Sequence, residues 1–127
     1  MERTLVLIKP DGIRKGLTCS DIIPSCDLKI VQTRQLTPTI EQARKHYIEH
    51  VNHSFYERIT NGLVEGEIIA MVIEGENAIK RIRAVIGNRA DPTTLRGKYS
   101  NPDIQHENAV HGSDTMESAE REIAIWF

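Results

Sequence analysis

The sequence predicts an α+β fold of the ferredoxin-like kind, an α/β sandwich in which helices cover a four-stranded antiparallel sheet. Two short apolar runs, at 4–8 and 67–75, are typical of buried strands. Two further strand patterns occur at 28–36 and 109–111, and helical patterns lie between the predicted strands. No internal repeat or linker divides the 127 residues, so we expect a single domain over 1–127.

The first strand and the turn after it are marked by composition. TLVLI at 4–8 is rich in β-formers and has no charged position, as expected for a central strand buried on both faces. Lys9-Pro10-Asp11-Gly12 has the composition of a tight turn. A short helix is possible within 17–25, where Pro24 limits its length.

A strand and two helices are predicted next. Residues 28–36 alternate in the manner of a strand. Thr37 or Thr39 can cap a helix over 40–50, and a second helical stretch covers roughly 53–63. These helices precede the buried strand at 67–75.

The third helical stretch, AIKRIRAVIG, has clear ends. Asn77 is expected to cap its start and Gly87 to end it. Its apolar stripe consists of Ile79, Ile82, Val85 and Ile86.

Residues 88–108 lack periodicity and are expected to form a long loop, a feature that tends to be functional in compact domains. A strand at 109–111 and a last helix complete the chain. On a helical wheel, the buried stripe of that helix consists of Met116, Ala119, Ile123 and Trp126.

The composition excludes several classes of protein. Apolar residues make up 39% of the chain and charged residues 27%, which indicates a globular domain rather than a disordered or membrane protein. The net charge of −2 gives no general reason to bind nucleic acid. The start, MERTLVLIKPDG, lacks a signal-peptide pattern. Cys19 and Cys26 fit two free thiols in a reducing cytoplasm.

His111 lies where a short strand meets a helix. Asp114 and Glu117 form a variant of the capping box, which predicts that the helix begins at 114–115. A helix N-terminus offers unpaired N–H groups and partial positive charge, both suited to phosphate. Glu122 borders the apolar stripe and could orient the imidazole. From spacing alone, a histidine that merely ends a strand and a solvated glutamate are the commoner interpretation.

Three basic residues could converge on phosphates. Lys9 follows a buried strand, Arg83 flanks the stripe of its helix, and Arg96 lies in the long loop. Alternatively, Arg83 in the last turn of its helix complements the helix dipole, and Lys9 and Arg96 are ordinary charged surface residues.

Two aromatic residues are further candidates. Tyr47 shares a helical face with apolar residues, so a core position is the default. Phe55 and Tyr56 point in different directions on a helix, so one could pack in the core while the other supports a nucleobase.

HYIEH at 46–50 matches H-x-x-E-H, an inverted zinc-peptidase signature. On a helix, His46 and His50 would share a face as two zinc ligands, with Glu49 as a base and His53 as a third ligand. No distal carboxylate ligand is evident, and a solvated helix face explains the pattern equally well.

Several stretches resemble, in order and nearly from end to end, the nucleoside diphosphate kinase family. RTLVLIKPDGIRKGL is similar to the family's opening strand and turn, and HYIEH…SFYE to its nucleotide-clamping helices. IIAMVIEGENAI is similar to its third strand and following helix, and LRG to its loop arginine. NAVHGSD…ESAEREIAIWF is close to its active-site signature and is the most specific of these. The resemblance favours a catalytic His111 over a structural one and argues against the zinc site.

The resemblance implies an enzyme, a nucleoside-diphosphate kinase, which is a phosphotransferase. It would move the γ-phosphate of a nucleoside triphosphate such as ATP to a nucleoside diphosphate by a ping-pong mechanism. His111 would be the nucleophile and form a phosphohistidine, and Glu122 would orient it with help from Ser113. Lys9 and Tyr47 would steady the transferring phosphoryl group.

The resemblance also implies how the nucleotide is bound. Arg83 and Arg96 would hold the other phosphates. Lys9 and Asn108 would reach the ribose hydroxyls, and Phe55 would stack on the base. Mg²⁺ would arrive on the nucleotide phosphates with few or no protein ligands, so no metal-ligand residue is assigned. The resemblance places the protein in cytoplasmic nucleotide metabolism as a homo-oligomer, with no membrane and no obligate nucleic-acid partner.

The chain departs from the family in several places, and the main difference is in one loop. GNRADPTTLRG is shorter than the usual segment, and a phosphate-binding threonine of the family falls in the gap, with Thr93 and Thr94 nearby. The shortened loop, 88–95, motivates an alternative function, a nucleotide-binding regulatory protein on the same fold with little turnover.

Overall fold

The structure is a computed structural model that describes residues 1–23 and 27–127. The predicted limit at Pro24 and the thiol of Cys26 lie outside the described residues. Four strands form one sheet in the order β2-β3-β1-β4, with every neighbouring pair antiparallel. The strands are β1 Glu2–Ile8, β2 Lys29–Leu36, β3 Ile68–Gly75 and β4 Val110–Gly112. The predicted ferredoxin-like α+β sandwich is confirmed.

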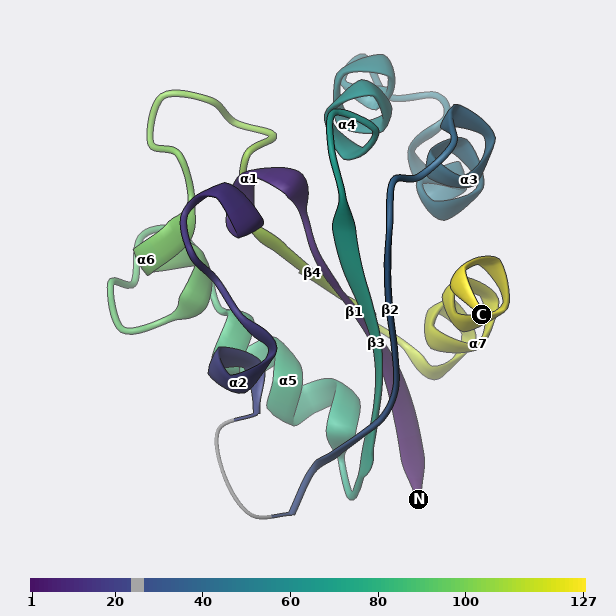
Figure 1. Cartoon of the computed structure of the whole chain (residues 1–127), viewed down its shortest axis with the longest axis vertical. Helices are drawn as coiled ribbons and strands as arrows, with labels where there is room; N and C mark the ends of the chain where they lie inside the picture. The colour runs from purple at the N-terminus through teal and green to yellow at the C-terminus, as the bar shows by residue number, and fades with distance from the viewer. Residues whose placement is uncertain (24–26) are drawn as a thin grey trace.

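Helices cover both faces of this sheet (Figure 1). They are α1 Pro10–Arg14, α2 Cys19–Ile22, α3 Ile40–His46, α4 Tyr56–Leu63, α5 Ala78–Ile86, α6 Leu95–Tyr99 and α7 Met116–Trp126, with a 3-10 turn η1 Ile48–His50. Figure 1 shows α2 and α5 on one side of the sheet and α3 and α7 on the other.

The continuous apolar run of β1 supplies both cores because alternate side chains of a strand point to opposite faces. Val6 and Ile8 pack with α5 residues such as Ile82. Leu5 and Leu7 pack in the second cluster with Ala43 of α3 and Trp126 of α7. A central strand buried on two sides explains why no polar residue interrupts 5–8.

Three predicted elements differ from the structure. The turn after β1 is the short helix α1, which begins at Pro10, a residue whose fixed φ suits a first helical position. The long loop contains α6, whose cap is Thr94, with its hydroxyl accepting from Gly97 N–H. The helix expected over 40–50 ends at His46, and residues 48–50 form η1 instead.

Two helix starts are capped by residues other than those predicted. Asn77 makes no side-chain cap bond, and the Glu2 carboxylate of β1 accepts instead from Ile79 N–H at 2.8 Å. In α7 the cap is Thr115, whose hydroxyl accepts from Ser118 N–H, instead of the predicted Asp114–Glu117 pair.

The predicted stripe of α7 is partly wrong. Met116 is 60% exposed, whereas Glu122 is only 4% exposed and lies among the buried residues of the helix. Ala119 and Trp126 are buried as predicted. The predicted stripe of α5 is confirmed at Ile79, Ile82 and Ile86, and Gly87 ends that helix with a positive φ of 62°.

The antiparallel pairing of β1 with β4 fixes the place of the predicted site. Leu7 pairs with His111, and Lys9 N–H donates to Ala109 O at 2.9 Å. A side chain on Gly12 would put its Cβ 2.4 Å from that same carbonyl oxygen, so the close approach requires glycine. The end of β1 and the start of β4 therefore lie side by side. In the described part of the chain, no helix has the length and apolar character needed to cross a bilayer.

Candidate active site

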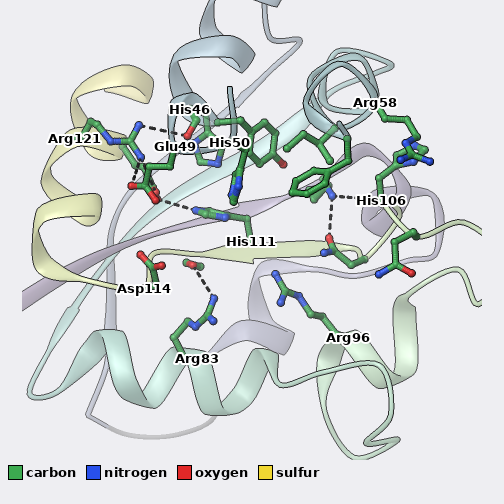
Figure 2. A pocket seen from close by; sticks show the side chains of 18 residues that line it. His46, Glu49, His50, Arg58, Arg83, Arg96, His106, His111, Asp114 and Arg121 are labelled. Carbon is green, nitrogen blue, oxygen red and sulfur yellow. Dashed lines mark hydrogen bonds and ion pairs between the residues drawn. The ribbon is translucent and has the colours of Figure 1, made fainter. Parts of the chain in front are cut away.

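Eight of the residues that the resemblance implies for the site line one pocket of about 420 Å³. They come from segments that are far apart in the sequence, and Figure 2 shows His111 between the η1 side of the pocket and two arginines. The eight are Lys9, Tyr47, Phe55, Arg83, Arg96, Asn108, His111 and Glu122.

His111 is held from behind by a buried carboxylate. Its Nε2 lies 2.7 Å from Glu122 Oε1, and the Ser113 hydroxyl donates to the same oxygen at 2.7 Å. The side chain of Glu122 is 5% exposed and that of His111 is 19% exposed. An ionised carboxylate can only accept hydrogen bonds, so this contact assigns the ring proton to Nε2. The lone pair of Nδ1 is then available for chemistry.

The electrostatic surroundings keep His111 neutral. Burial, together with the positive charges of Arg96, Lys9 and Arg83, lowers its pKa to about 3. A neutral imidazole has the lone pair that a nucleophile needs, and no deprotonation step is required at neutral pH. Burial acts in the opposite sense on the carboxyl group and raises the pKa of Glu122.

Two arginines face His111 from the other side of the pocket (Figure 2). Arg96 Nε and Nη2 donate to Val110 O at 3.2 and 3.1 Å, and Arg83 Nη1 donates to Gly112 O at 3.3 Å. Each guanidinium carries five N–H donors, so anchoring to one carbonyl leaves it able to bind phosphate oxygens. Both anchors are carbonyls of β4, the strand that carries His111.

Lys9 is held between the polar groups of the loop before β4. Its Nζ donates to His106 O at 2.7 Å and to Asn108 Oδ1 at 2.9 Å. The residue is only 5% exposed, and this burial lowers the pKa of Lys9 to about 8, with Arg96 adding to the shift and Asp11 opposing it. The structure thus brings a lysine, an amide and two arginines to one pocket, which suits a polyanion.

Tyr47 and Phe55 lie on the helical side of the pocket. Tyr47 is half-buried and packs edge-on against His46, with ring centroids 4.8 Å apart, and burial raises the pKa of its phenol. Phe55 is 37% exposed and lies 5.5 Å from the ring of His50 and 4.9 Å from that of His53. An exposed aromatic face of this kind can stack on a nucleobase.

The structure does not support the alternative interpretation of HYIEH as a zinc site. Because α3 ends at His46, the two histidines do not share a helical face. His46 is buried, and its Nδ1 accepts a hydrogen bond from Trp126 Nε1 at 3.1 Å. His50 Nδ1 is instead hydrogen-bonded to His53 Nδ1 at 3.1 Å. Glu49 is bonded to Ser118 and Arg121 of α7 instead of serving as a base.

One group of possible metal ligands does occur within residues 1–23 and 27–127. Donor atoms of His46, His111 and Glu122 lie within 4.8 Å of one another. However, Arg121 lies 3.5 Å from Glu122 Oε2, and the other charged groups around His111 are mainly cations. This electrostatic environment favours an anion over a cation.

The sequence did not indicate the position of two residues of the site: His46 was considered only as a zinc ligand, and Arg121 was not considered. His46 packs edge-on against His111 with ring centroids 4.3 Å apart, and Arg121 contacts the Glu122 carboxylate. Each of the two is the sequence neighbour of a predicted site residue, and His46 also belongs to HYIEH. The neighbouring threonines do not take the place of the missing family threonine. Thr94 donates to Asn88 O and Asp91 O, Thr93 donates to the Asp91 carboxylate, and neither lines the pocket.

Comparisons with known proteins agree with this geometry. The family profile described as nucleoside diphosphate kinase matches residues 2–127. The chain is 40% identical to a nucleoside diphosphate kinase of Caldanaerobacter subterraneus, over all of this chain and 94% of that protein. It is 43% identical to one of Nocardioides, over 98% of this chain and 96% of that protein.

Solved structures give the same result. The Aquifex aeolicus nucleoside diphosphate kinase superposes with a TM-score of 0.89 at 32% identity, over 99% of this chain and 94% of that one. The Encephalitozoon cuniculi enzyme gives a TM-score of 0.90 at 33% identity, over 100% and 89%. The chain therefore belongs to the nucleoside diphosphate kinase family, and the prediction of an enzyme of this family is confirmed.

Proposed function

We propose that this chain transfers the γ-phosphate of a nucleoside triphosphate to a nucleoside diphosphate by a ping-pong mechanism, through a phosphohistidine at His111. One observation carries the proposal. His111 is a neutral imidazole whose Nε2 is held by Glu122 and whose Nδ1 is left for a pocket lined by Lys9, Arg83 and Arg96. We also propose that residues 1–127 form a single domain that carries this activity.

The reaction proceeds in two displacements at phosphorus. In the first, the Nδ1 lone pair of His111 forms a bond to the γ-phosphorus, and the bond to the bridging oxygen breaks with its electron pair leaving on the nucleoside diphosphate. In the second, a terminal oxygen of another nucleoside diphosphate attacks the same phosphorus and the nitrogen–phosphorus bond breaks. Nε2 keeps its proton throughout, held by Glu122.

The cations of the pocket stabilise the charge that moves during transfer. Lys9 and Tyr47 steady the transferring phosphoryl group, and Arg83 and Arg96 bind the other phosphates. Fixed donors are effective here because the pocket is partly closed to water and the groups need little reorganisation. Anchoring both guanidinium groups to β4 carbonyls keeps them aligned with His111.

The remaining part of the pocket binds the nucleoside. Phe55 stacks on the base. Stacking accepts any of the bases because every base has a π-face. Lys9 Nζ donates a hydrogen bond to Asn108 Oδ1 at 2.9 Å, and both side chains reach the ribose hydroxyls. The charged groups of the pocket suit phosphate oxygens, so we propose that Mg²⁺ enters as part of the nucleotide substrate.

The exposed strand β2 supports a homo-oligomer. It forms one edge of the sheet, and of its eight residues only Ile30 and Leu36 are partly buried. An open edge of this kind can pair with another chain. We propose that a second copy of this chain covers it, and that the protein acts in the cytoplasm, as the cysteine spacing favours.

The edge strand gives a prediction for assembly. Val31→Lys places a charge at a position of β2 that is 37% exposed, and charges on edge strands oppose pairing. We expect sedimentation velocity to show a shift of this variant toward the monomer. Val51→Lys, at a valine that is 48% exposed outside β2, is the matched control and keeps the assembly. Equal sedimentation of both variants and wild type would place the interface elsewhere.

The pKa of Lys9 gives a prediction for pH dependence. Lys9 loses its charge as pH rises through about 8, so kcat/KM, which reports the free enzyme, falls above this pH. In Lys9→Arg the guanidinium keeps its charge, and the alkaline limb moves out of the range up to about pH 10. Steady-state pH profiles of both proteins measure the difference. Superimposable alkaline limbs would mean that another group causes the limb.

Initial-rate kinetics test the proposed function directly. Varying the triphosphate at several fixed diphosphate concentrations should give parallel double-reciprocal lines, the pattern of a ping-pong mechanism. Intersecting lines would indicate direct transfer in a ternary complex and would refute the phosphohistidine. Nucleotide binding without exchange would support the alternative, a regulatory protein on the same fold with little turnover.

A further inference from the structure

We propose that Arg121 is a positioning residue for phosphoryl transfer, which acts through Glu122 to hold His111 in the orientation and tautomer that attack requires. The inference rests on the proposed function and adds a role for Arg121, which makes no hydrogen bond or ion pair to His111 or β4 among the described residues. Arg121 lies one residue before Glu122 in α7.

The contacts of Glu122 divide between its two oxygens. Oε1 receives the His111 imidazole and the Ser113 hydroxyl, each at 2.7 Å. Oε2 faces Arg121 Nη2 at 3.5 Å. The carboxylate is thus held on both sides, and a rotation that would release His111 also takes Oε2 away from the guanidinium.

Arg121 is itself fixed by contacts outside α7. Its Nη1 donates to Lys45 O at 2.8 Å and to His46 O at 3.4 Å, which are carbonyls of the last turn of α3. Its Nη2 donates to Glu49 Oε1 at 3.1 Å. Carbonyls at a helix C-terminus lack partners within the helix, and an arginine is well suited to them. The guanidinium is therefore a fixed charge, in contrast to a mobile surface arginine.

The protonation state of Glu122 decides which nitrogen of His111 is free. An ionised carboxylate accepts from Nε2–H and leaves the Nδ1 lone pair open. A protonated carboxyl would donate to Nε2, which would place the ring proton on Nδ1 and block attack. Burial raises the pKa of Glu122, and the positive charge of Arg121 opposes this shift. Arg121 thus protects the reactive tautomer.

Other groups around Glu122 contribute to the same balance. On its α3 side lies His46, whose proximity also lowers the carboxyl pKa, and the Ser113 hydrogen bond acts in the same direction. Asp114, at the entrance to α7, raises the carboxyl pKa. Glu49 of η1 shares the Arg121 guanidinium. Arg121 is the one side chain of the described residues whose positive charge directly contacts Glu122.

The experiment compares Arg121→Gln, Arg121→Lys and wild type, with Arg81→Gln as the matched control. Arg81 of α5 donates to a backbone carbonyl, Glu76 O, but does not line the pocket. In Arg121→Gln we expect kcat to fall about tenfold with KM little changed, and the acidic limb of kcat to move to higher pH. Arg121→Lys restores the position of the limb because the charge remains. Arg81→Gln changes none of these quantities.

A second measurement does not depend on turnover. The ¹⁵N chemical shifts of the His111 ring, without nucleotide, report its tautomer. Wild type should show the proton on Nε2 at neutral pH, and Arg121→Gln should gain the Nδ1–H form as pH falls. Urea unfolding of wild type and Arg121→Gln identifies any general loss of structure. If Arg121→Gln is destabilised, wild type is compared with Arg121→Lys instead.

The outcomes separate this inference from the function on which it rests. A rise in KM with kcat unchanged would make Arg121 a nucleotide ligand and would overturn the positioning role. If kcat, the acidic limb of its pH profile and the His111 tautomer were all unchanged in Arg121→Gln, the positioning role would also be overturned. Phosphorylation of His111 in the wild type would still support the proposed function. A wild type that exchanges phosphate without modification of His111 would overturn the proposed function itself.

Discussion

Replacing His111 with alanine is expected to lower phosphoryl exchange by at least about 10⁴-fold, because the proposed reaction then loses its nucleophile. The variant keeps Lys9, Arg83 and Arg96, so nucleotide affinity should remain close to that of wild type. The loss therefore falls on kcat and not on binding. A coupled assay of exchange, together with calorimetric titration of ADP, measures the two quantities separately.

The His111 variant needs a control for folding and for loss of a histidine in general. The His111 side chain is 19% exposed, so its truncation opens the pocket without emptying a closed core. His53→Ala, at an exposed histidine that does not line the pocket, should keep activity within about twofold. Exchange that persists in His111→Ala at more than about one per cent of wild type would contradict a covalent route through this residue.

Replacing Trp126 with alanine is expected to lower the free energy of unfolding by about 4 kcal/mol, the largest stability effect we predict. Trp126 is fully buried and packs with Leu5, Leu7 and Ala43 in the core beneath α3 and α7. Truncation leaves a cavity where the indole was. It also leaves His46 Nδ1 without the donor that it has at 3.1 Å.

Trp126→Phe separates these two effects. Phenylalanine fills most of the cavity but cannot donate to His46, so we expect a loss of about 1 kcal/mol from the hydrogen bond plus a smaller packing loss. Urea denaturation at fixed pH gives both values. If Trp126→Ala cost less than Trp126→Phe, the indole would contribute little by packing, contrary to its burial.

Elements that depend on local pattern could be predicted from the sequence. The strands of the sheet follow from runs such as 4–8, because a strand buried on two faces needs apolar residues at every position. The stripe of α5 follows from its period, and Gly87 from the conformation that ends a helix. The short helices α1 and α6, of five residues each, were missed because helices of this length depend on tertiary contacts.

Features that depend on contacts between distant segments could not be predicted. Glu2 caps α5 across 77 positions of sequence, and no local signal links the two. His46 was assigned to a helical face, but the bond to Trp126, 80 positions away, places it behind His111. Arg121 was overlooked because its partners lie in α3 and η1. Local patterns and the resemblance indicated the candidate residues, and the structure gives the geometry between them.

The most direct test of the account is to mix the protein with ATP labelled on its γ-phosphate, with no acceptor present. We predict one labelled phosphoryl group per chain, stable in base and labile in acid, mapped to His111 and discharged when a nucleoside diphosphate is added. A protein that exchanges phosphate rapidly but never retains the label, or that retains it on another residue, would contradict transfer through His111.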